Sequence, residues 1–231
     1  PKKENRLDNN FSLQGLNIQG NLEYTLNQLR HFHETKALNQ VKQYNLLFYG
    51  PAGTGKSELA KYISKELDRD LIIKRASDLP DPYVGMTERH IADMFSEAEA
   101  KEAVLVLDEA DSFVFGRDKA VRSWEVSHVN EFLTQMEKYQ GILICTTNRF
   151  KDLDQASVRR FNQKLFFDYL NHEGIQVFYD KFLSNLCTNK IDKYLSGKLL
   201  KFKRLTLGDF KNIRDRYILE QAKVTHADMI S

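Results

Sequence analysis

The chain has 231 residues, which suits one large domain or a domain with a small appendage, and 42% of them are hydrophobic, enough for a buried core. With 34 basic against 32 acidic residues the net charge is +2, so nothing in the overall balance indicates a nucleic acid or a membrane surface as partner. Cys145 and Cys187 are too few and too far apart for a disulfide framework or a zinc site, which favours a reducing, cytoplasmic setting.

Two features concern the limits of the chain. No stretch approaches 18 consecutive apolar residues and no signal peptide is visible, so we expect no transmembrane helix. Because the sequence opens with Pro1 rather than Met, we expect it to be a piece of a longer protein.

In chain order, residues 1–20 are polar and irregular and are interpreted as a linker, and residues 21–40 place leucines at helical spacing. Short apolar runs then predict strands at 45–49, 71–75, 103–107, 142–146 and 164–167. Between and after them, amphipathic stretches predict helices at 56–68, 87–101, 123–138, 154–160, 173–187 and 208–223.

Apolar strands that alternate with helices indicate an α/β fold, with a parallel five-stranded sheet covered on both faces. From about residue 172 the strand pattern stops, which indicates a small helical domain. We therefore predict a linker and first helix over 1–44, an α/β domain over 45–171 and a helical domain over 172–231.

The stretch "FYGPAGTGKSELA" joins the first predicted strand to the next helix. Gly50, Gly55, Lys56 and Ser57 fit the pattern G-x-x-x-x-G-K-[ST], whose glycines let backbone N–H groups wrap a phosphate chain at a helix N-terminus. Lys56 is then expected to reach the β and γ phosphates of ATP, and Ser57 to bind Mg²⁺. The alternative is a flexible glycine turn with a surface lysine. The predicted nucleotide contacts are Gly50, Pro51, Ala52, Gly53, Thr54, Gly55, Lys56, Ser57 and Glu58.

The stretch "VLVLDEAD", residues 104–111, places acids at the end of the most apolar predicted strand. Carboxylates are costly to bury there unless a cation neutralises them, and in nucleotide-binding sheets the carboxyl ends of the strands face the ligand. We expect Asp108 to hold Mg²⁺ and Glu109 to act as the base that orients the attacking water. The alternative is that the acids cap the following helix.

With both motifs, the chain resembles the AAA+ ATPases, and specifically the AAA family proper, over nearly all of its length. The resemblance implies a three-layer P-loop NTPase fold with a small C-terminal helical lid, ATP hydrolysis with Mg²⁺, and assembly into a hexamer. "GPAGTGKS" and "VLVLDEAD" are shared with many other NTPases, so the family assignment depends on the motifs that follow.

Two of these motifs follow the predicted fourth strand. "CTTN" places Asn148 between the two sites, where the family has a polar sensor that positions water or contacts the γ-phosphate; the alternative is an asparagine that caps the loop. "LDQASVRRF" is similar to the family's second region of homology, in the short form of the microtubule-severing and membrane-remodelling clade. Arg159 and Arg160, about 100° apart on a helix, would then reach a neighbouring subunit's γ-phosphate; the alternative is a solvated basic turn.

"DPYVGMTERHIADMF" resembles the loop with which AAA proteins grip a polypeptide in the hexamer pore, so Tyr83 and Val84 are candidate substrate contacts. The alternative is that both side chains pack into the core. Met86 stands where many relatives have Glu. "GRDKAVRSWE", residues 116–125, falls where a second pore loop is expected, and Trp124 is assigned to neither core nor pore.

The predicted helical domain resembles the AAA lid, in which "LTLGDFKNIRDRY" is similar to the segment that packs on the adenine. A sensor arginine of the lid is not apparent, because Gly208 falls near its position and Arg214 follows only a turn and a half later. Residues 188–216 carry nine Lys or Arg against three Asp, a basic excess that fits a solvated face or a subunit contact better than a nucleic-acid site.

The sequence therefore predicts an ATP-driven motor that remodels or unfolds protein substrates through a hexamer pore. The alternative is a nucleic-acid-associated AAA+ ATPase of the clamp-loader or initiator type, which has no need of the pore aromatic. A nucleotide-gated scaffold is disfavoured by the intact catalytic set, and the absence of H-E-x-x-H from the sequence argues against a zinc protease within it.

Overall fold

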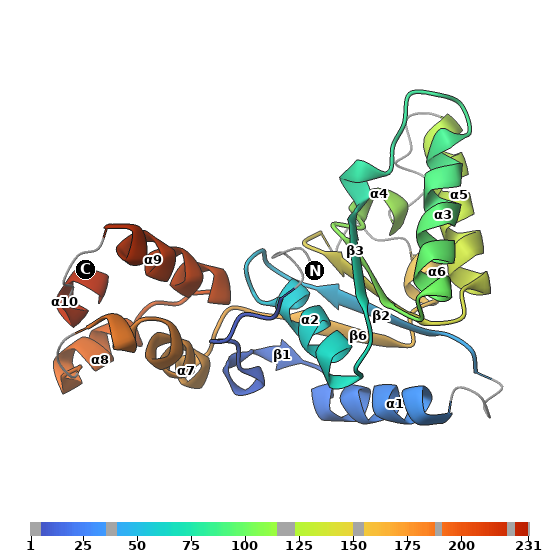
Figure 1. Ribbon diagram of the computed structural model, residues 1–231. Helices are drawn as coiled ribbons and strands as arrows, with labels where there is room; N and C mark the ends of the chain where they lie inside the picture. Colours follow the sequence, from blue (N-terminus) through green and yellow to red (C-terminus); the bar gives the residue numbers. More distant parts are fainter. Residues whose placement is uncertain are drawn as a thin grey trace. The chain divides into compact units, whose positions relative to one another are not determined.

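The structure is a computed structural model that describes residues 6–35, 41–114, 123–149, 155–187, 191–220 and 225–230 (Figure 1). The chain divides into two compact units. The sheet unit contains Gly20–Gly50 and Ala60–Phe166, together with the first six residues. The lid unit contains Leu7–Gln19, Pro51–Leu59 and Phe167–Ser231.

The sheet contains the five predicted strands, β2 (Tyr44–Tyr49), β3 (Leu71–Arg75), β4 (Val104–Asp108), β5 (Ile142–Thr147) and β6 (Gln163–Phe167). A sixth strand of two residues, β1 (Ile18–Gln19), joins it, so the predicted count of five is one too few; a strand this short has no periodicity to detect. The strand order is β1-β6-β2-β5-β4-β3, and β2 pairs in parallel with both β5 and β6, as β4 does with β3 and β5.

Helices cover both faces of this sheet. Leu47, Leu105 and Leu143 point to one face, where they pack with the apolar sides of α3 (Met86–Ala100) and α5 (Ser123–Lys138). Tyr44 points to the other face, because strand side chains alternate, and its ring lies 5.8 Å from that of Phe32 in α1 (Leu22–Thr35). The unit is thus the three-layer α/β arrangement that the alternation of strands and helices predicted.

The described residues form further helices besides α1, α3 and α5. They are α2 (Lys56–Glu66), the 3₁₀ turn Ala76–Asp78, α4 (Asp111–Val114), α6 (Gln155–Val158), α7 (His172–Phe182), the 3₁₀ turn Ser184–Leu186, α8 (Lys193–Leu199), α9 (Leu207–Glu220) and α10 (His226–Ile230). The sequence pattern did not predict α4, α8 and α10, which have four, seven and five residues and are too short for helical periodicity to show.

The lid unit has its own core. Its apolar residues come from α7 to α10 and the segments between them: Leu170, Ile175, Phe178, Tyr179, Phe182, Leu183, Leu199, Leu207, Phe210 and Ile230. Tyr179 and His226 close this core with a hydrogen bond of 2.6 Å between the Tyr179 hydroxyl and His226 Nδ1. Small helices that share one buried cluster form a unit consistent with the predicted helical lid.

Residues 7–19 are not the linker that their polar composition predicted. The 3₁₀ turn Leu13–Gly15 lies against α7 so closely that a Cβ on Gly174 would stand 2.4 Å from the Gly15 carbonyl oxygen. Asn17 adds a 2.6 Å hydrogen bond from its Nδ2 to the Tyr169 carbonyl. Contacts made by glycine backbones and by an asparagine side chain leave no apolar pattern in the sequence, so hydrophobic periodicity could not predict this packing.

The boundary between the units also differs from the prediction. The lid unit begins its last segment at Phe167 rather than 172 and includes the loop Pro51–Leu59. The loop belongs there because Gly208 N donates to the Gly53 carbonyl at 2.9 Å. Within the described part of the chain, no helix combines the length and the apolar character needed to cross a membrane.

Candidate nucleotide-binding and catalytic site

The phosphate loop has the backbone that its glycines predicted. Gly53 and Gly55 have φ angles of +76° and +101°, a region that L-residues with side chains rarely occupy. A Cβ on Gly53 would also stand 2.8 Å from Thr206 Oγ1. The glycines are therefore required by the conformation of the loop and by its close approach to the segment before α9.

Lys56 is the first residue of α2, and its ammonium group folds back over the loop. Lys56 Nζ donates to the Pro51 carbonyl at 2.7 Å, and Thr54 Oγ1 donates to the same oxygen at 2.8 Å. Lys56 is only 7% exposed, which is unusual for a lysine and contradicts the alternative of a surface lysine on a flexible turn. Ser57 and Glu58 follow in the first turn and are half-buried. Backbone N–H groups at a helix start beside a held ammonium form a cradle for an anion.

The acids at the end of β4 are held by the neighbouring strand. Thr146 Oγ1 donates a hydrogen bond to Asp108 Oδ1 and accepts one from Glu109 N at 3.2 Å. Glu109 lies in a turn with φ +55°, and its side chain is exposed. The strained turn leaves Asp108 anchored at the strand end and presents the Glu109 carboxylate to solvent.

Thr147 and Asn148 lie next to each other at the end of β5 but differ in their surroundings. Thr147 Oγ1 donates to Asp111 Oδ1 and accepts from Arg149 N at 2.9 Å, so it is Thr147 that caps this loop. Asn148, for which a capping role was the alternative interpretation, is exposed. Since β5 lies between β2 and β4, Asn148 follows the strand between those that lead to Gly50 and to Asp108, as predicted.

Sequence reasoning missed Thr146 and Thr147. The signal was present in "CTTN", since two hydroxyl side chains at the end of one parallel strand meet polar groups at the end of the next. Without the strand order, however, their partners could not be assigned.

Arg159 and Arg160 lie beyond the end of α6 rather than on a predicted helix over 154–160, so the 100° argument does not apply to them. They occupy a turn closed by a 3.1 Å bond from Arg160 N to the Ser157 carbonyl. Arg159 is exposed, whereas Arg160 Nε pairs with Glu137 Oε1 at 2.6 Å. The two arginines are therefore held differently.

The loop before α3 presents Tyr83 and Val84 to solvent. Their exposed fractions are 75% and 105%, so neither packs into the core, and that alternative is wrong. Two hydrogen bonds of 2.9 Å hold the backbone at the base of the loop: Tyr83 N donates to Asp81 Oδ1, and Asp81 N donates to Thr87 Oγ1. An aromatic and an aliphatic side chain are thus displayed by a hydrogen-bonded backbone.

The predicted site residues are divided between the two compact units. Pro51 to Glu58 belong to the lid unit, whereas Asp108, Glu109, Asn148, Arg159 and Arg160 belong to the sheet unit. Most of the predicted second pore loop, residues 115–122, lies outside the described residues, as does the Trp124 side chain.

A glycine loop that opens a helix, a parallel sheet, and acids at the end of one of its strands define an α/β nucleotide-binding ATPase. Residues 46–169 match the model of the ATPase family associated with various cellular activities (AAA), and the chain belongs to this family. It is an AAA ATPase.

Relatives of the chain come from a virus, a vertebrate and a bacterium. An uncharacterized protein, ORF529, of Acidianus two-tailed virus is 36% identical over 174 residues, which cover 69% of this chain and 32% of the relative. Spastin of Xenopus laevis is 29% identical over 170 residues, 71% of this chain and 28% of spastin. The ATP-dependent zinc metalloprotease FtsH of Clostridium perfringens is 32% identical over 131 residues, 53% of this chain and 18% of FtsH. The chain spans a third or less of the length of each.

Proposed function

We propose that this AAA ATPase binds ATP with Mg²⁺ and uses hydrolysis to remodel or unfold protein substrates. Lys56 and the loop amides would hold the phosphates, because the Pro51 carbonyl already holds the Lys56 ammonium at the loop, beside the N-terminus of α2. Ser57 and Asp108 would each offer an oxygen to Mg²⁺, a hard cation that prefers such ligands and that neutralises phosphate charge when bound. Glu109 would orient and deprotonate water, and Asn148 would position it.

The arginines give the proposed site its dependence on a second copy of the chain. Arg159 is exposed, so it can reach the γ-phosphate of a neighbouring subunit without breaking a contact of its own that the structure describes. Arg160 would have to leave Glu137. A ring, in this family a hexamer, would supply every site with arginines in trans.

The exposure of Tyr83 and Val84 carries the proposal of a protein substrate. Exposing apolar side chains of this kind to water raises the free energy unless a partner covers them, and an extended polypeptide offers apolar and backbone surface to an aromatic ring. The relative from Clostridium perfringens is named an ATP-dependent zinc metalloprotease, an enzyme that acts on proteins.

The substrate class is tested by ATP turnover with an unfolded polypeptide, with single-stranded DNA, and with neither. We expect the polypeptide to raise turnover and Tyr83→Ala to remove that increase. Tyr194→Ala is the matched control, because Tyr194 is 79% exposed but lies on α8 of the lid. Stimulation by DNA alone would favour the clamp-loader or initiator type and overturn the proposed substrate.

The shared site is tested by turnover per subunit against protein concentration. We expect turnover to rise with concentration in the parent protein and to be lost at every concentration in Arg159→Ala. Glu137→Gln removes the carboxylate charge that pairs with Arg160 and should not lower turnover if Arg160 acts in trans. Turnover that is independent of concentration and indifferent to Arg159→Ala contradicts the trans arrangement.

A further inference from the structure

Residues 7–19 connect two functional parts of the lid unit, the phosphate loop and α9. They pack directly against α7: Gly15 lies so close to Phe178 of α7 that a Cβ on Gly15 would stand 2.6 Å from the Phe178 ring. They are further held by Asn17, whose carbonyl accepts from Asp168 N at 2.9 Å. The segment is therefore a packed part of the unit, and its first residues can carry a defined interaction.

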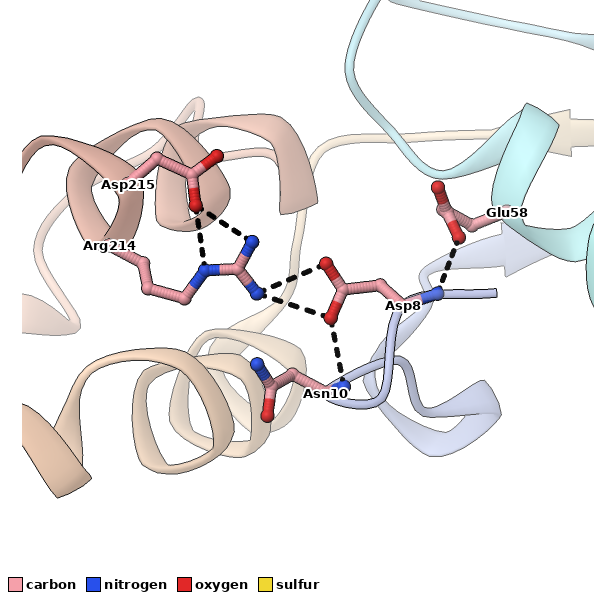
Figure 2. A network of polar contacts seen from close by, with 5 residues as sticks. All are labelled: Asp8, Asn10, Glu58, Arg214 and Asp215. Atoms are coloured by element: carbon pink, nitrogen blue, oxygen red, sulfur yellow. Dashed lines mark hydrogen bonds and ion pairs between the residues drawn. The ribbon is translucent and has the colours of Figure 1, made fainter. Parts of the chain in front are cut away.

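Asp8 lies at the start of this segment and faces α9. Arg214 Nη1 donates to Asp8 Oδ2 at 3.0 Å and to Asp8 Oδ1 at 3.2 Å, across 206 positions of sequence. The exposed fractions of the two side chains are only 13% and 16%, so the pair is largely removed from water. Asn10 N donates to Asp8 Oδ1 at 3.0 Å and fixes the carboxylate further (Figure 2).

Arg214 is held on its remaining sides as well. Its Nε donates to Asp215 Oδ1 at 2.9 Å, and its guanidinium lies over the Phe182 ring at 5.0 Å. Burial opposes the charged form, but the hydrogen bonds to Asp215 and Asp8 outweigh it and raise the pKa of Arg214. Removing Asp8 would leave a largely buried guanidinium with an unpaired donor, and the loss of one partner from such an ion pair is strongly destabilising.

The backbone of Asp8 reaches the phosphate loop. Asp8 N donates to Glu58 Oε2 at 3.2 Å, and Glu58 follows Ser57 in the first turn of α2. Figure 2 shows Asp8 between Arg214 on one side and Glu58 on the other, with three segments of the chain meeting at one residue. A second link is direct, from Gly208 N of α9 to the Gly53 carbonyl at 2.9 Å.

We propose that Asp8 and Arg214 are positioning residues for ATP binding: through Glu58, their ion pair holds the start of α2 in register with α9. The Asp8–Arg214 pair and the Asp8–Glu58 bond together are called the Asp8 latch. In this proposal Arg214 does not contact the nucleotide itself; it positions Asp8, which in turn positions the start of α2. The latch concerns the nucleotide only, so it is independent of the proposed ring and protein substrate.

The test is the affinity for Mg²⁺–ATP by calorimetry, in the full chain with Glu109→Gln so that ATP is not consumed. We expect Asp8→Asn and Arg214→Gln each to raise Kd about tenfold or more, a typical size for coupling between positions. The double variant should bind no more weakly than either single one, because both remove the same pair. Arg216→Gln is the matched control, since Arg216 lies on α9 and pairs with Glu220.

A second pair of measurements distinguishes a positioning role of Asp8 and Arg214 in ATP binding from a purely structural role. In the turnover-competent chain, KM for ATP should rise in Asp8→Asn while kcat at saturation stays within about twofold, as for an interaction made equally in ground and transition states. Arg214→Lys keeps the cation and should recover part of the affinity. If Asp8→Asn does not fold, the ATP affinities of Arg214→Lys and Arg216→Lys are compared instead, and only Arg214→Lys should bind ATP more weakly than the parent.

A Kd within twofold of the parent in folded Asp8→Asn, with only the unfolding temperature lowered, would overturn the latch. Lys56→Ala in the same background separates this result from failure of the site. Lost binding in Lys56→Ala with unchanged binding in Asp8→Asn overturns the latch alone, whereas unchanged binding in both overturns the phosphate site too.

Discussion

The acidic end of β4 and the loop before α3 both carry side chains assigned to function, but they are held in opposite ways. At the strand end, Asp108 and Asp111 each receive a hydrogen bond from a threonine of β5, so the proposed Mg²⁺ ligand Asp108 and its neighbour Asp111 are fixed through their own oxygens. In the loop, only the backbone is braced, and Tyr83 and Val84 stand in solvent.

The difference fits what each region is proposed to recognise. Catalysis on a phosphate requires oxygens placed to a fraction of an ångström, which side-chain hydrogen bonds from a rigid strand supply. A loop that meets polypeptides of many sequences gains nothing from fixing its side chains in one pose. Bracing the backbone while leaving the side chains uncovered keeps the loop in place and lets it adapt.

The largest effect is expected at Glu109. Glu109→Gln keeps the size of the side chain but removes the base, so we expect turnover to fall by about 100-fold or more. Binding of ATP should be retained, since Glu109 is exposed and its proposed role concerns the attacking water rather than the phosphates. Turnover and calorimetry on the same preparation check this, and turnover within tenfold of the parent would remove Glu109 from the role of base.

A smaller loss is expected when the brace of Asp108 is removed. Thr146→Val keeps the shape of a buried side chain but deletes the hydroxyl that serves both Asp108 and Glu109 N. We expect turnover to fall about tenfold, because a misplaced carboxylate loses part of its effect without being lost. Thr134→Val is the control, since its hydroxyl bonds only the Asn130 carbonyl of its own helix. Equal turnover in both variants would show that the strand hydrogen bonds do not position the acids.

The contrast between the regions also explains what the sequence could predict. Strand ends, the glycine loop and the acidic motif appear in the sequence because each depends on local pattern and residue type. The packing of Gly15 on Gly174 and the pair Asp8–Arg214 depend on residues far apart along the chain. Nothing in their local sequence marks them, which is why residues 7–19 looked like a linker.

The arginines show the same limit at short range. Their presence in "RRF" was informative, but α6 ends at Val158, so their directions depend on a turn that helical geometry does not describe. Likewise, the exposure of Tyr83 could not be decided from the sequence, because an aromatic residue beside a glycine is compatible with a core or a surface position.

On the loop, Gly85 gives an intermediate prediction. Its φ is +80°, and a Cβ there would meet no atom within 4 Å, so Gly85→Ala introduces backbone strain without a clash. We expect stability to fall by about 1 kcal/mol and the stimulation of turnover by polypeptide to weaken, because the strain is relieved by moving the loop. Gly197→Ala on α8 is the control for added bulk, since its Cβ also meets nothing within 4 Å and no positive φ is required. Equal stimulation in both variants would indicate that loop position is unimportant.

The smallest effect concerns the pH dependence of the helix behind the loop. A hydrogen bond of 2.7 Å from Ser127 Oγ is the main cause that lowers the pKa of Glu88 below its ordinary value of 4.5. A lowered carboxyl pKa stabilises the fold at pH values above the ordinary pKa, and this contribution is lost as the pH falls through the folded value. Ser127→Ala should therefore cost about 0.5–1 kcal/mol in urea unfolding at pH 7 and progressively less below pH 4.5. A difference that is constant from pH 7 to pH 3 would mean that the Ser127 hydroxyl does not act through the Glu88 carboxylate.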